Sequence, residues 1–403
     1  MTRDKSDSTS VEPSLAPVTV AVASFANMFC IGTVYALSTL QAQLSRLFGI
    51  SNVWSLAPFG ATCLGLSIGV LTSASMIIQS GAHATAARGT TLWGVTVIGA
   101  GISFSSLKLG LMIICFLFGG VGIGWTYLAV VALITQGLPK HALARSAIGP
   151  LGFSTAAAMF FFLSSVFGVD AADAETLGRM LVLLGVTFAA VGASTQLSLS
   201  IFYKDSAMGS PQNSLTEDSG PFFSTLLFFN ALPGMTLFSG LLPLASHYTS
   251  DTDNKMWIIS CCMIALAFGG VLAPSICAYF GARLTFVGIL FLRGVLLILL
   301  SQFERSTQAI YTMLAILFAH GTGFSILPVL IKTQNRNQQL FYFKYGRVLV
   351  SWGIAGIVGT VVNSILLSQA SSISTGVMLV GLLTLLSGII MYFVPALGGK
   401  LFA

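Results

Sequence analysis

Twelve long apolar runs, separated by short polar connections, constrain how this 403-residue chain can fold. About 20 apolar residues in a helix are needed to cross a bilayer, and in lipid a single segment satisfies its backbone hydrogen bonds only as a helix. The sequence therefore predicts an all-α integral membrane protein with twelve transmembrane helices. They cover approximately residues 17–43, 53–79, 88–106, 109–135, 147–168, 177–202, 221–246, 256–280, 284–302, 307–331, 343–368 and 373–397.

Composition excludes an ordinary soluble protein, because 55% of the residues are hydrophobic and 7% are charged. The net charge of +6 comes from basic residues scattered through short connections, without a basic stripe or aromatic platforms, so we expect no nucleic-acid partner. The apolar run after the first sixteen residues is too long for a signal-peptide core, so we expect it to be retained as a helix.

The chain shows no pattern typical of an enzyme. Its six cysteines all lie within apolar runs and form no CxxC pair, which disfavours disulfides and metal sites, and we expect no cofactor. The predicted helices contain no HExxH motif and no carboxylate pair. A GxSxG string at 65–69 lies within a predicted helix rather than at a strand-to-helix turn, so Ser67 is not expected to be a nucleophile.

A polar segment divides the chain into six helices before it and six after it, which is typical of two-repeat transporters. The twelve helices, the central break and the absence of a ring-forming repeat favour a transporter over a channel. The predicted domains are a cytoplasmic tail (1–16), an N-terminal six-helix bundle (17–202), a cytoplasmic linker (203–220), a C-terminal six-helix bundle (221–397) and a second cytoplasmic tail (398–403).

Basic residues predict the orientation, since Lys and Arg are retained on the cytoplasmic side. With the N terminus inside, twelve basic residues lie in cytoplasmic segments and five in external ones. The eighteenth, Arg293, lies in the middle of a predicted helix, whereas all twelve carboxylates lie outside the predicted helices. Without an intramembrane acid, we expect a uniporter or an exchanger, with at most weak proton coupling through His320.

Two stretches carry a resemblance to a known family. The first contains closely spaced glycines followed by a tyrosine, a proline, a basic residue and a second glycine pair, at Gly120, Gly122, Gly124, Tyr127, Pro139, Arg145, Gly149 and Gly152. The second carries YG, WG and spaced glycines, at Tyr345, Gly346, Trp352, Gly353, Gly356 and Gly359. Both resemble the oxalate/formate antiporter and monocarboxylate carrier group of the major facilitator superfamily.

The resemblance implies the major facilitator fold, alternating access and a monocarboxylate-like solute, in a multi-pass protein of the plasma membrane or bacterial inner membrane. It also implies function as a monomer, with the small-molecule solute and the lipid bilayer as partners. Two alternatives stay open: a carrier of a neutral or amphipathic solute, and a sensor or scaffold that does not transport.

Polar and aromatic side chains within the predicted helices are the candidate substrate-binding residues, because such groups are poorly placed against lipid. In the first helix, Tyr35, Ser38 and Gln41 lie three residues apart and share one face. The full candidate set is Tyr35, Gln41, Tyr127, Asn230, His320 and Trp352. Hydrogen bonding between helices is the alternative role for Tyr35, Gln41 and Tyr127, and the role of a structural donor is the alternative for His320.

Departures from the family pattern bear on the substrate. Aligned by spacing, a lysine of the oxalate carriers falls at Trp352 and an arginine of the carboxylate carriers at Gly270. The loop motif's aspartate is replaced by Ile78 before Gly81 and by Ala278 before Gly281. We therefore expect a monoanionic or neutral substrate, held between aromatic faces and by neutral hydrogen bonds.

Arg293 needs compensation, since a cation at the bilayer centre costs about 2.5–3.5 kcal/mol on insertion scales. Three interpretations stay open at this point: hydrogen bonding to groups of adjacent helices, direct contact with the substrate, and snorkelling from a helix whose boundaries are misplaced.

The orientation predicts which polar segments face the cytoplasm. In single-cysteine variants, we expect a membrane-impermeant thiol reagent to label Ser214→Cys from the cytoplasmic side and Thr252→Cys from outside, because basic residues are concentrated in the segments assigned to the inside. Sided labelling of intact cells and inverted vesicles measures this. The reverse pattern contradicts the orientation.

Overall fold

The computed structural model describes residues 15–139, 142–168, 172–203, 220–248, 255–303, 306–334, 337–368 and 373–393. Within these ranges every regular element is a helix. Most of the predicted tail at 1–16, the whole tail at 398–403 and most of the linker at 203–220 lie outside them, as do Ser214 and Thr252.

Six spanning segments form the first half of the chain. Three pieces, α1, η1 and α2, follow one another without a gap and make up the first segment, and α3 precedes α4 in the second. The elements are α1 (Leu15–Gly32), η1 (Thr33–Leu40), α2 (Gln41–Phe48), α3 (Asn52–Ser55), α4 (Ala57–Ser80), α5 (Ala82–Ser105), α6 (Leu109–Gly137), α7 (Ala142–Val166) and α8 (Ala174–Phe202).

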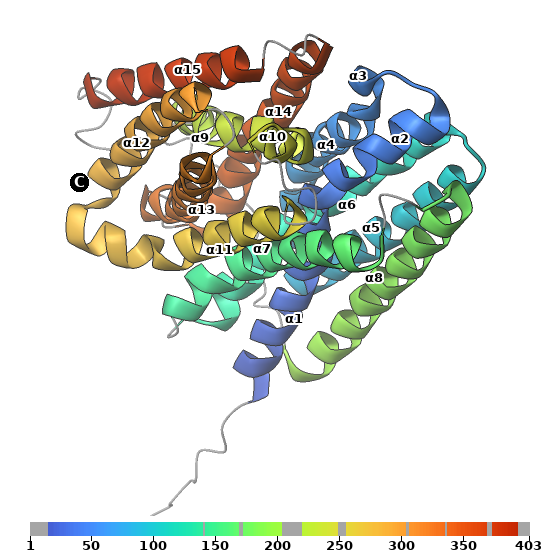
Figure 1. Cartoon of the computed structure of the whole chain (residues 1–403). Helices are drawn as coiled ribbons and strands as arrows, with labels where there is room; N and C mark the ends of the chain where they lie inside the picture. The colour runs from blue at the N-terminus through green and yellow to red at the C-terminus, as the bar shows by residue number, and fades with distance from the viewer. Residues whose placement is uncertain are drawn as a thin grey trace, which may run out of the picture.

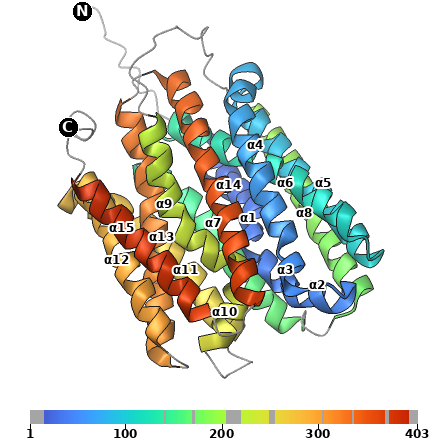
Figure 2. The ribbon, with the colours of Figure 1, turned by 90° about the horizontal axis from the view of Figure 1, so that it is seen from above.

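Six more segments form the second half, in which α10 continues α9. The elements are α9 (Gly220–Ser239), α10 (Leu241–Tyr248), α11 (Lys255–Phe280), α12 (Ala282–Gln302), α13 (Thr307–Gln334), α14 (Gln338–Ser368) and α15 (Ile373–Phe393). The two halves lie side by side, the first coloured blue to green and the second yellow-green to red in Figure 1. Figure 2 shows the long helices running roughly along one direction.

Eleven helical segments of the described chain are long and apolar enough to cross a membrane. The twelfth segment, α5, is 24 residues long but rich in Gly, Ala and Thr, so its hydropathy is lower. Its glycines replace apolar contact with close backbone packing: a Cβ on Gly94 would lie 2.4 Å from Ala189 N in α8. The helix is therefore held by protein neighbours, as expected where lipid gives helices no hydrophobic reason to associate.

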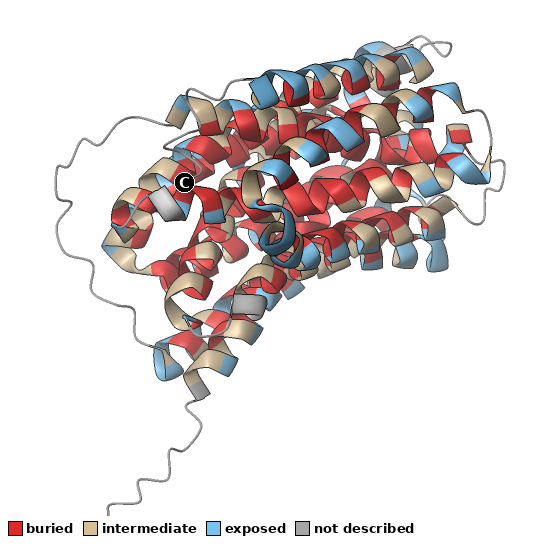
Figure 3. Ribbon diagram, turned by 90° about the vertical axis from the view of Figure 1, so that its left-hand side faces the viewer, coloured by how far each residue is buried: buried red, intermediate tan, exposed pale blue. Residues whose placement is uncertain are grey.

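The glycines of α6 pack against two neighbours at once. A Cβ on Gly120 would lie 2.1 Å from Thr62 O in α4, and one on Gly122 would lie 2.5 Å from Gly89 O in α5. Alternate glycines thus seat α6 against the backbones of both helices. Across the bundle, buried residues face inward and exposed residues lie on the outer faces of the helices, as Figure 3 shows for the side nearest the viewer.

The same local structure occurs in both halves, two hundred positions apart. Gly81 and Gly281 have φ of +87° and +78°, which only glycine adopts readily, and each ends one helix and starts the next. The hydroxyls of Thr85 and Thr285 each donate to the carbonyl of the preceding glycine at 2.8 Å. The turn is therefore retained in both repeats, although the loop aspartates expected before each glycine are Ile78 and Ala278.

Helix boundaries differ from the predicted ones mainly at polar ends. α5 begins at Ala82 rather than 88, α7 at Ala142 rather than 147, and α14 at Gln338 rather than 343. Hydropathy alone places these starts too late because the first turns carry polar side chains. Thr85, for example, lies in the first turn of α5 and donates to Gly81 O at 2.8 Å.

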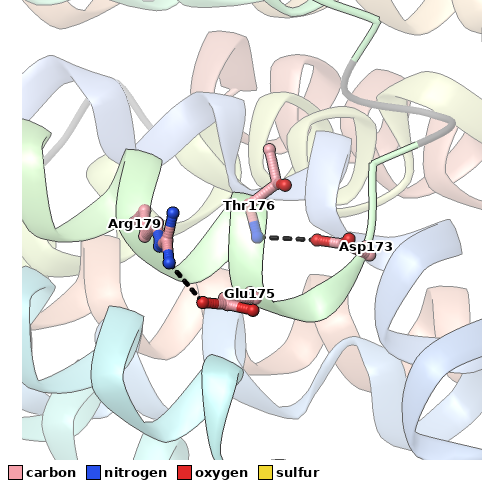
Figure 4. Close-up of polar contacts among 4 residues, drawn as sticks. All are labelled: Asp173, Glu175, Thr176 and Arg179. Carbon is pink, nitrogen blue, oxygen red and sulfur yellow. Dashed lines mark hydrogen bonds and ion pairs between the residues drawn. The ribbon is translucent and has the colours of Figure 1, made fainter.

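The expectation that every carboxylate lies outside the helices is wrong for Glu175, which lies in the first turn of α8. It forms an ion pair with Arg179 one turn on (Figure 4). The Thr176 amide donates to Asp173 Oδ1 at 2.7 Å and holds the pKa of that carboxyl below its ordinary value. Negative groups are favourable at a helix N terminus, so this charge caps α8 rather than entering the membrane interior.

The packing of α6 predicts an asymmetry between two glycines of that helix. Gly120→Ala should lower the stability of the purified protein by about 1–3 kcal/mol, because its Cβ would overlap a backbone carbonyl that cannot rotate away. Gly110→Ala is the matched control, since a Cβ there meets no atom within 4 Å. Thermal unfolding in detergent measures both variants, and equal melting temperatures contradict the packing argument.

Candidate functional site

A cavity of about 600 Å³ lies between the two halves. Its wall is formed by α1, η1, α6 and α7 from the first half and by α11, α13 and α14 from the second. It extends from Tyr35 and Trp352, within the helices, to Arg145 and Lys332 near the end of the bundle where α8 ends and α9 begins, here called the linker end. The topology prediction places the linker end in the cytoplasm.

Cross-half helix pairs close the bundle on either side of this cavity. Between α7 and α11, the Ser260 hydroxyl donates to Ala158 O at 3.0 Å. Between α4 and α14, the Ser67 hydroxyl donates to Val350 O at 3.3 Å, and a Cβ on Gly353 would lie 2.4 Å from Cys63 O. Ser67 is thus a packing residue at the interface of the halves, and α7 and α11 meet beyond the cavity, away from the linker end.

Aromatic rings from both halves surround Trp352 at the inner part of the cavity. Its ring centroid lies 5.0 Å from that of Tyr127, 5.4 Å from Phe324 and 5.9 Å from Phe153. Tyr35 in turn contacts Phe153 edge to face at 4.8 Å. The wall therefore offers flat apolar faces to a ligand, with hydroxyl groups from the two tyrosines.

The indole N–H of Trp352 does not serve as a free donor. It donates to Met235 Sδ at 3.3 Å, within the second half. The Tyr127 hydroxyl lies 3.5 Å from that of Tyr345 on α14, so it too has a partner in the opposite half. Trp352 therefore contributes its apolar surface to the cavity.

Behind the wall lies a buried cation. Arg293, in the middle of α12, is completely buried and points toward α9 and α13. Its Nη1 lies 2.9 Å from both the Asn230 carbonyl oxygen and His320 Nδ1, and its Nη2 donates to Asn230 Oδ1 at 3.1 Å. Of the three interpretations of Arg293, the structure excludes snorkelling and shows bonding to adjacent helices.

Two glycines make room for this cluster. A Cβ on Gly234 would lie 2.1 Å from Cε1 of His320, and one on Gly323 would lie 2.1 Å from Asn230 Oδ1. A larger residue at either position would displace a member of the cluster. Neither glycine was distinguishable by sequence pattern alone, because the chain contains 42 glycines.

Four of the six candidate residues line the cavity: Tyr35, Tyr127, His320 and Trp352. Asn230 lies behind the wall, where it holds Arg293. Gln41 lines a separate cavity of about 10 Å³. Tyr35 and Gln41 do share a helical face, but six residues of 3₁₀ helix advance the chain by about 12 Å, which carries Gln41 past the main cavity.

Several lining residues were not among the candidates. Phe153 and Phe324 lie on the wall, but nothing in the sequence separates them from the other 28 of the 30 phenylalanines. Arg145, Gly149 and Pro150 are also on the wall, and their place in the glycine-rich stretch was the available signal. Lys332 also lines the cavity, and together with Arg145 it makes the cavity basic at the linker end.

Comparison with known proteins identifies the fold. Neither protein-family models nor curated proteins match the sequence. Among solved structures, the crystal structure of a D-xylose-proton symporter is similar with a TM-score of 0.73 and 12% sequence identity, covering 96% of this chain and 99% of that one. The protein therefore has the all-helical membrane fold of major facilitator transporters. At this identity, the resemblance to the oxalate/formate antiporter and monocarboxylate carrier group stays a prediction.

The geometry of α7 predicts which of its positions water can reach. In a background with the six cysteines replaced by alanine, Gly149→Cys should react rapidly with a water-soluble methanethiosulfonate, because Gly149 lines the cavity and a Cβ there meets no atom within 4 Å. Ala156→Cys is the control on the same helix, with 1% of the residue exposed. Similar labelling rates by mass spectrometry contradict a water-filled cavity.

Proposed function

We propose that the protein is a transporter that moves a small organic monoanion, of the monocarboxylate kind, by alternating access. The supporting geometry is a cavity between two repeated halves, reaching one end of the bundle and closed by helix pairs at the other. Ligands of two-repeat transporters bind near the membrane midplane at the interface of the repeats. The aromatic residues around Trp352 come from both halves, which supports a ligand site there.

The observation that carries the proposal is the sign of the charge around the cavity. Arg145 and Lys332 lie on its wall, and Arg293 lies directly behind His320. The carboxylates in the described parts of the chain are Asp173 and Glu175, at the start of α8, and neither lines the cavity. A cavity with cations and no described acid favours an anion, and the attraction of Arg293 is weakly screened because that side chain is buried away from water.

The inner cavity is less suited to a dianion. Gly270 has no room for a side chain, because a Cβ there would lie 2.4 Å from Pro150 Cβ. Trp352 occupies the position that corresponds by spacing to the lysine of oxalate carriers. A second negative charge would be left unpaired deep in the cavity, at a cost of several kcal/mol even after relaxation.

The proposed protein acts as a monomer. Each half contributes helices to the cavity wall, so a monomer contains a complete site. We place the protein in the plasma membrane or bacterial inner membrane, with 1–16, the 203–220 linker and 398–403 in the cytoplasm.

A neutral or amphipathic solute is the second candidate, and the aromatic surface around Trp352 is the observation that favours it.

Uptake by proteoliposomes tests the proposal. The purified protein should take up radiolabelled benzoate or pyruvate saturably, and it should not exchange oxalate or take up D-xylose. The monoanions match a single buried cation, whereas oxalate leaves one charge unpaired and xylose leaves the cation without a partner. Protein-free liposomes and heat-denatured protein provide the baselines.

Each alternative has its own outcome in this experiment. Saturable oxalate exchange contradicts the charge argument. Saturable uptake of D-xylose with no uptake of either monoanion favours the neutral-solute carrier. Absence of uptake for the whole panel favours a sensor or scaffold.

A further inference from the structure

The hydrogen bonds of Arg293 fix the protonation of a cavity residue. A guanidinium group only donates hydrogen bonds. Its Nη1 lies 2.9 Å from His320 Nδ1, so that nitrogen must present a lone pair. The imidazole is then neutral and carries its proton on Nε2. The hydrogen bond from Arg293 therefore favours the tautomer of His320 that is protonated on Nε2.

The proton on Nε2 has no partner in the protein. Nε2 is buried and makes no hydrogen bond, although His320 lies on the cavity wall. The ring is held in place by Phe238 and Phe324, whose centroids lie 5.4 Å and 5.0 Å away. A buried donor without an acceptor is unusual, because buried polar groups are nearly always paired. Because Nε2 is buried and His320 is only 1% exposed, an acceptor in the cavity reaches this proton only after the ring or a neighbouring side chain shifts.

The cluster also has an excess of positive charge. Neither described carboxylate, Asp173 or Glu175 at the start of α8, is bonded to it, and the partners of Arg293 are neutral. An anion that accepts from Nε2 would be separated from the guanidinium by one imidazole ring. The positive charge of Arg293 would then attract the negative charge of the anion across the ring, in surroundings with little water to screen the attraction.

We propose that His320 and Arg293 form a carboxylate-recognition site, in which the His320 Nε2–H binds a carboxylate oxygen and Arg293 is a positioning residue behind it. The site takes a monocarboxylate with an apolar skeleton, aromatic acids included, because Tyr35, Phe153, Phe324 and Trp352 supply flat apolar surfaces beside it. This inference rests on the proposed function and assigns the group that recognises the anion.

The tautomer can be measured without knowing the natural solute. The protein has four histidines, so ¹⁵N-histidine labelling of the full chain in nanodiscs gives few signals, and the His320→Gln variant assigns those of His320. We expect Nδ1 to be unprotonated and Nε2 protonated from about pH 5 to about pH 8, the range in which an ordinary histidine changes charge. Benzoate should shift the Nε2 signal, and the neutral amide benzamide should not.

Substitutions at Arg293 separate positioning from simple structural support. Arg293→Lys keeps a cationic donor and should keep the tautomer. Arg293→Met removes the donor, so His320 should titrate in the same pH range or populate both tautomers. A role limited to folding would change the melting temperature in both variants and leave the His320 signals of the folded fraction as in the wild type.

Binding of radiolabelled benzoate tests recognition directly. His320→Phe keeps a ring but loses the donor and should weaken benzoate binding at least tenfold, whereas His320→Gln keeps an N–H donor and should retain more affinity. Ser387→Ala is the control, since Ser387 is buried in α15, which does not line the cavity, and its hydroxyl donates to Thr384 O within the same helix. It should bind benzoate as the wild type does.

Several results would overturn the site. They are a His320 Nδ1 that is protonated in the wild type, benzoate binding that His320→Phe leaves unchanged, and no binding of benzoate by the wild type. Uptake of pyruvate in liposomes together with any of these outcomes would leave the proposed function standing and remove the His320 site. Tight benzoate binding without uptake of any solute would support the site and contradict transport.

Discussion

The absence of water in the bilayer core is the constraint on which the rest of this structure depends. Backbone groups there must be satisfied within the segment, so the apolar runs become helices. Lipid then gives these helices no hydrophobic reason to associate, and they are held by close backbone contact at small residues. Gly120, Gly122 and Gly94 show this in the first half, where added Cβ atoms would overlap neighbouring backbones. The same reliance on glycine positions His320 and Asn230 against α9 and α13.

Much of the fold could be predicted from the sequence, because hydropathy over about 20 residues is a strong signal. The twelve segments and the polar break after Phe202 follow from local pattern. Helix starts at polar turns, such as Ala82, were placed too late because hydropathy does not detect a first turn that carries charged or hydroxyl groups. Glu175 was assigned to a loop for the same reason.

The candidate site is harder to predict from the sequence, because it depends on which helix faces pack against one another in the tertiary structure. Spacing put Tyr35 and Gln41 on one face, but spacing does not say where along that face the cavity ends. Trp352 lies 5.0 Å from Tyr127 between ring centroids, and its indole N–H donates to Met235 Sδ, contacts that no motif encodes. The sequence shows that Arg293 needs compensation. It does not identify the partners, because these lie on two other helices, α9 and α13, and meet Arg293 only in the tertiary structure.

The partners of Arg293 explain how a cation can remain in a bundle with so few acids. Three hydrogen bonds to neutral acceptors replace part of its hydration, which lowers the cost of burial without cancelling the charge. A carboxylate partner would have cancelled it and left the inner part of the cavity, away from Arg145 and Lys332, without an unbalanced charge. Because Asn230 and His320 are neutral, the guanidinium keeps an unbalanced charge that reaches the cavity through one imidazole. A single unbalanced cation is complementary to one negative charge, which links a structural requirement of α12 to the preference for a monoanion.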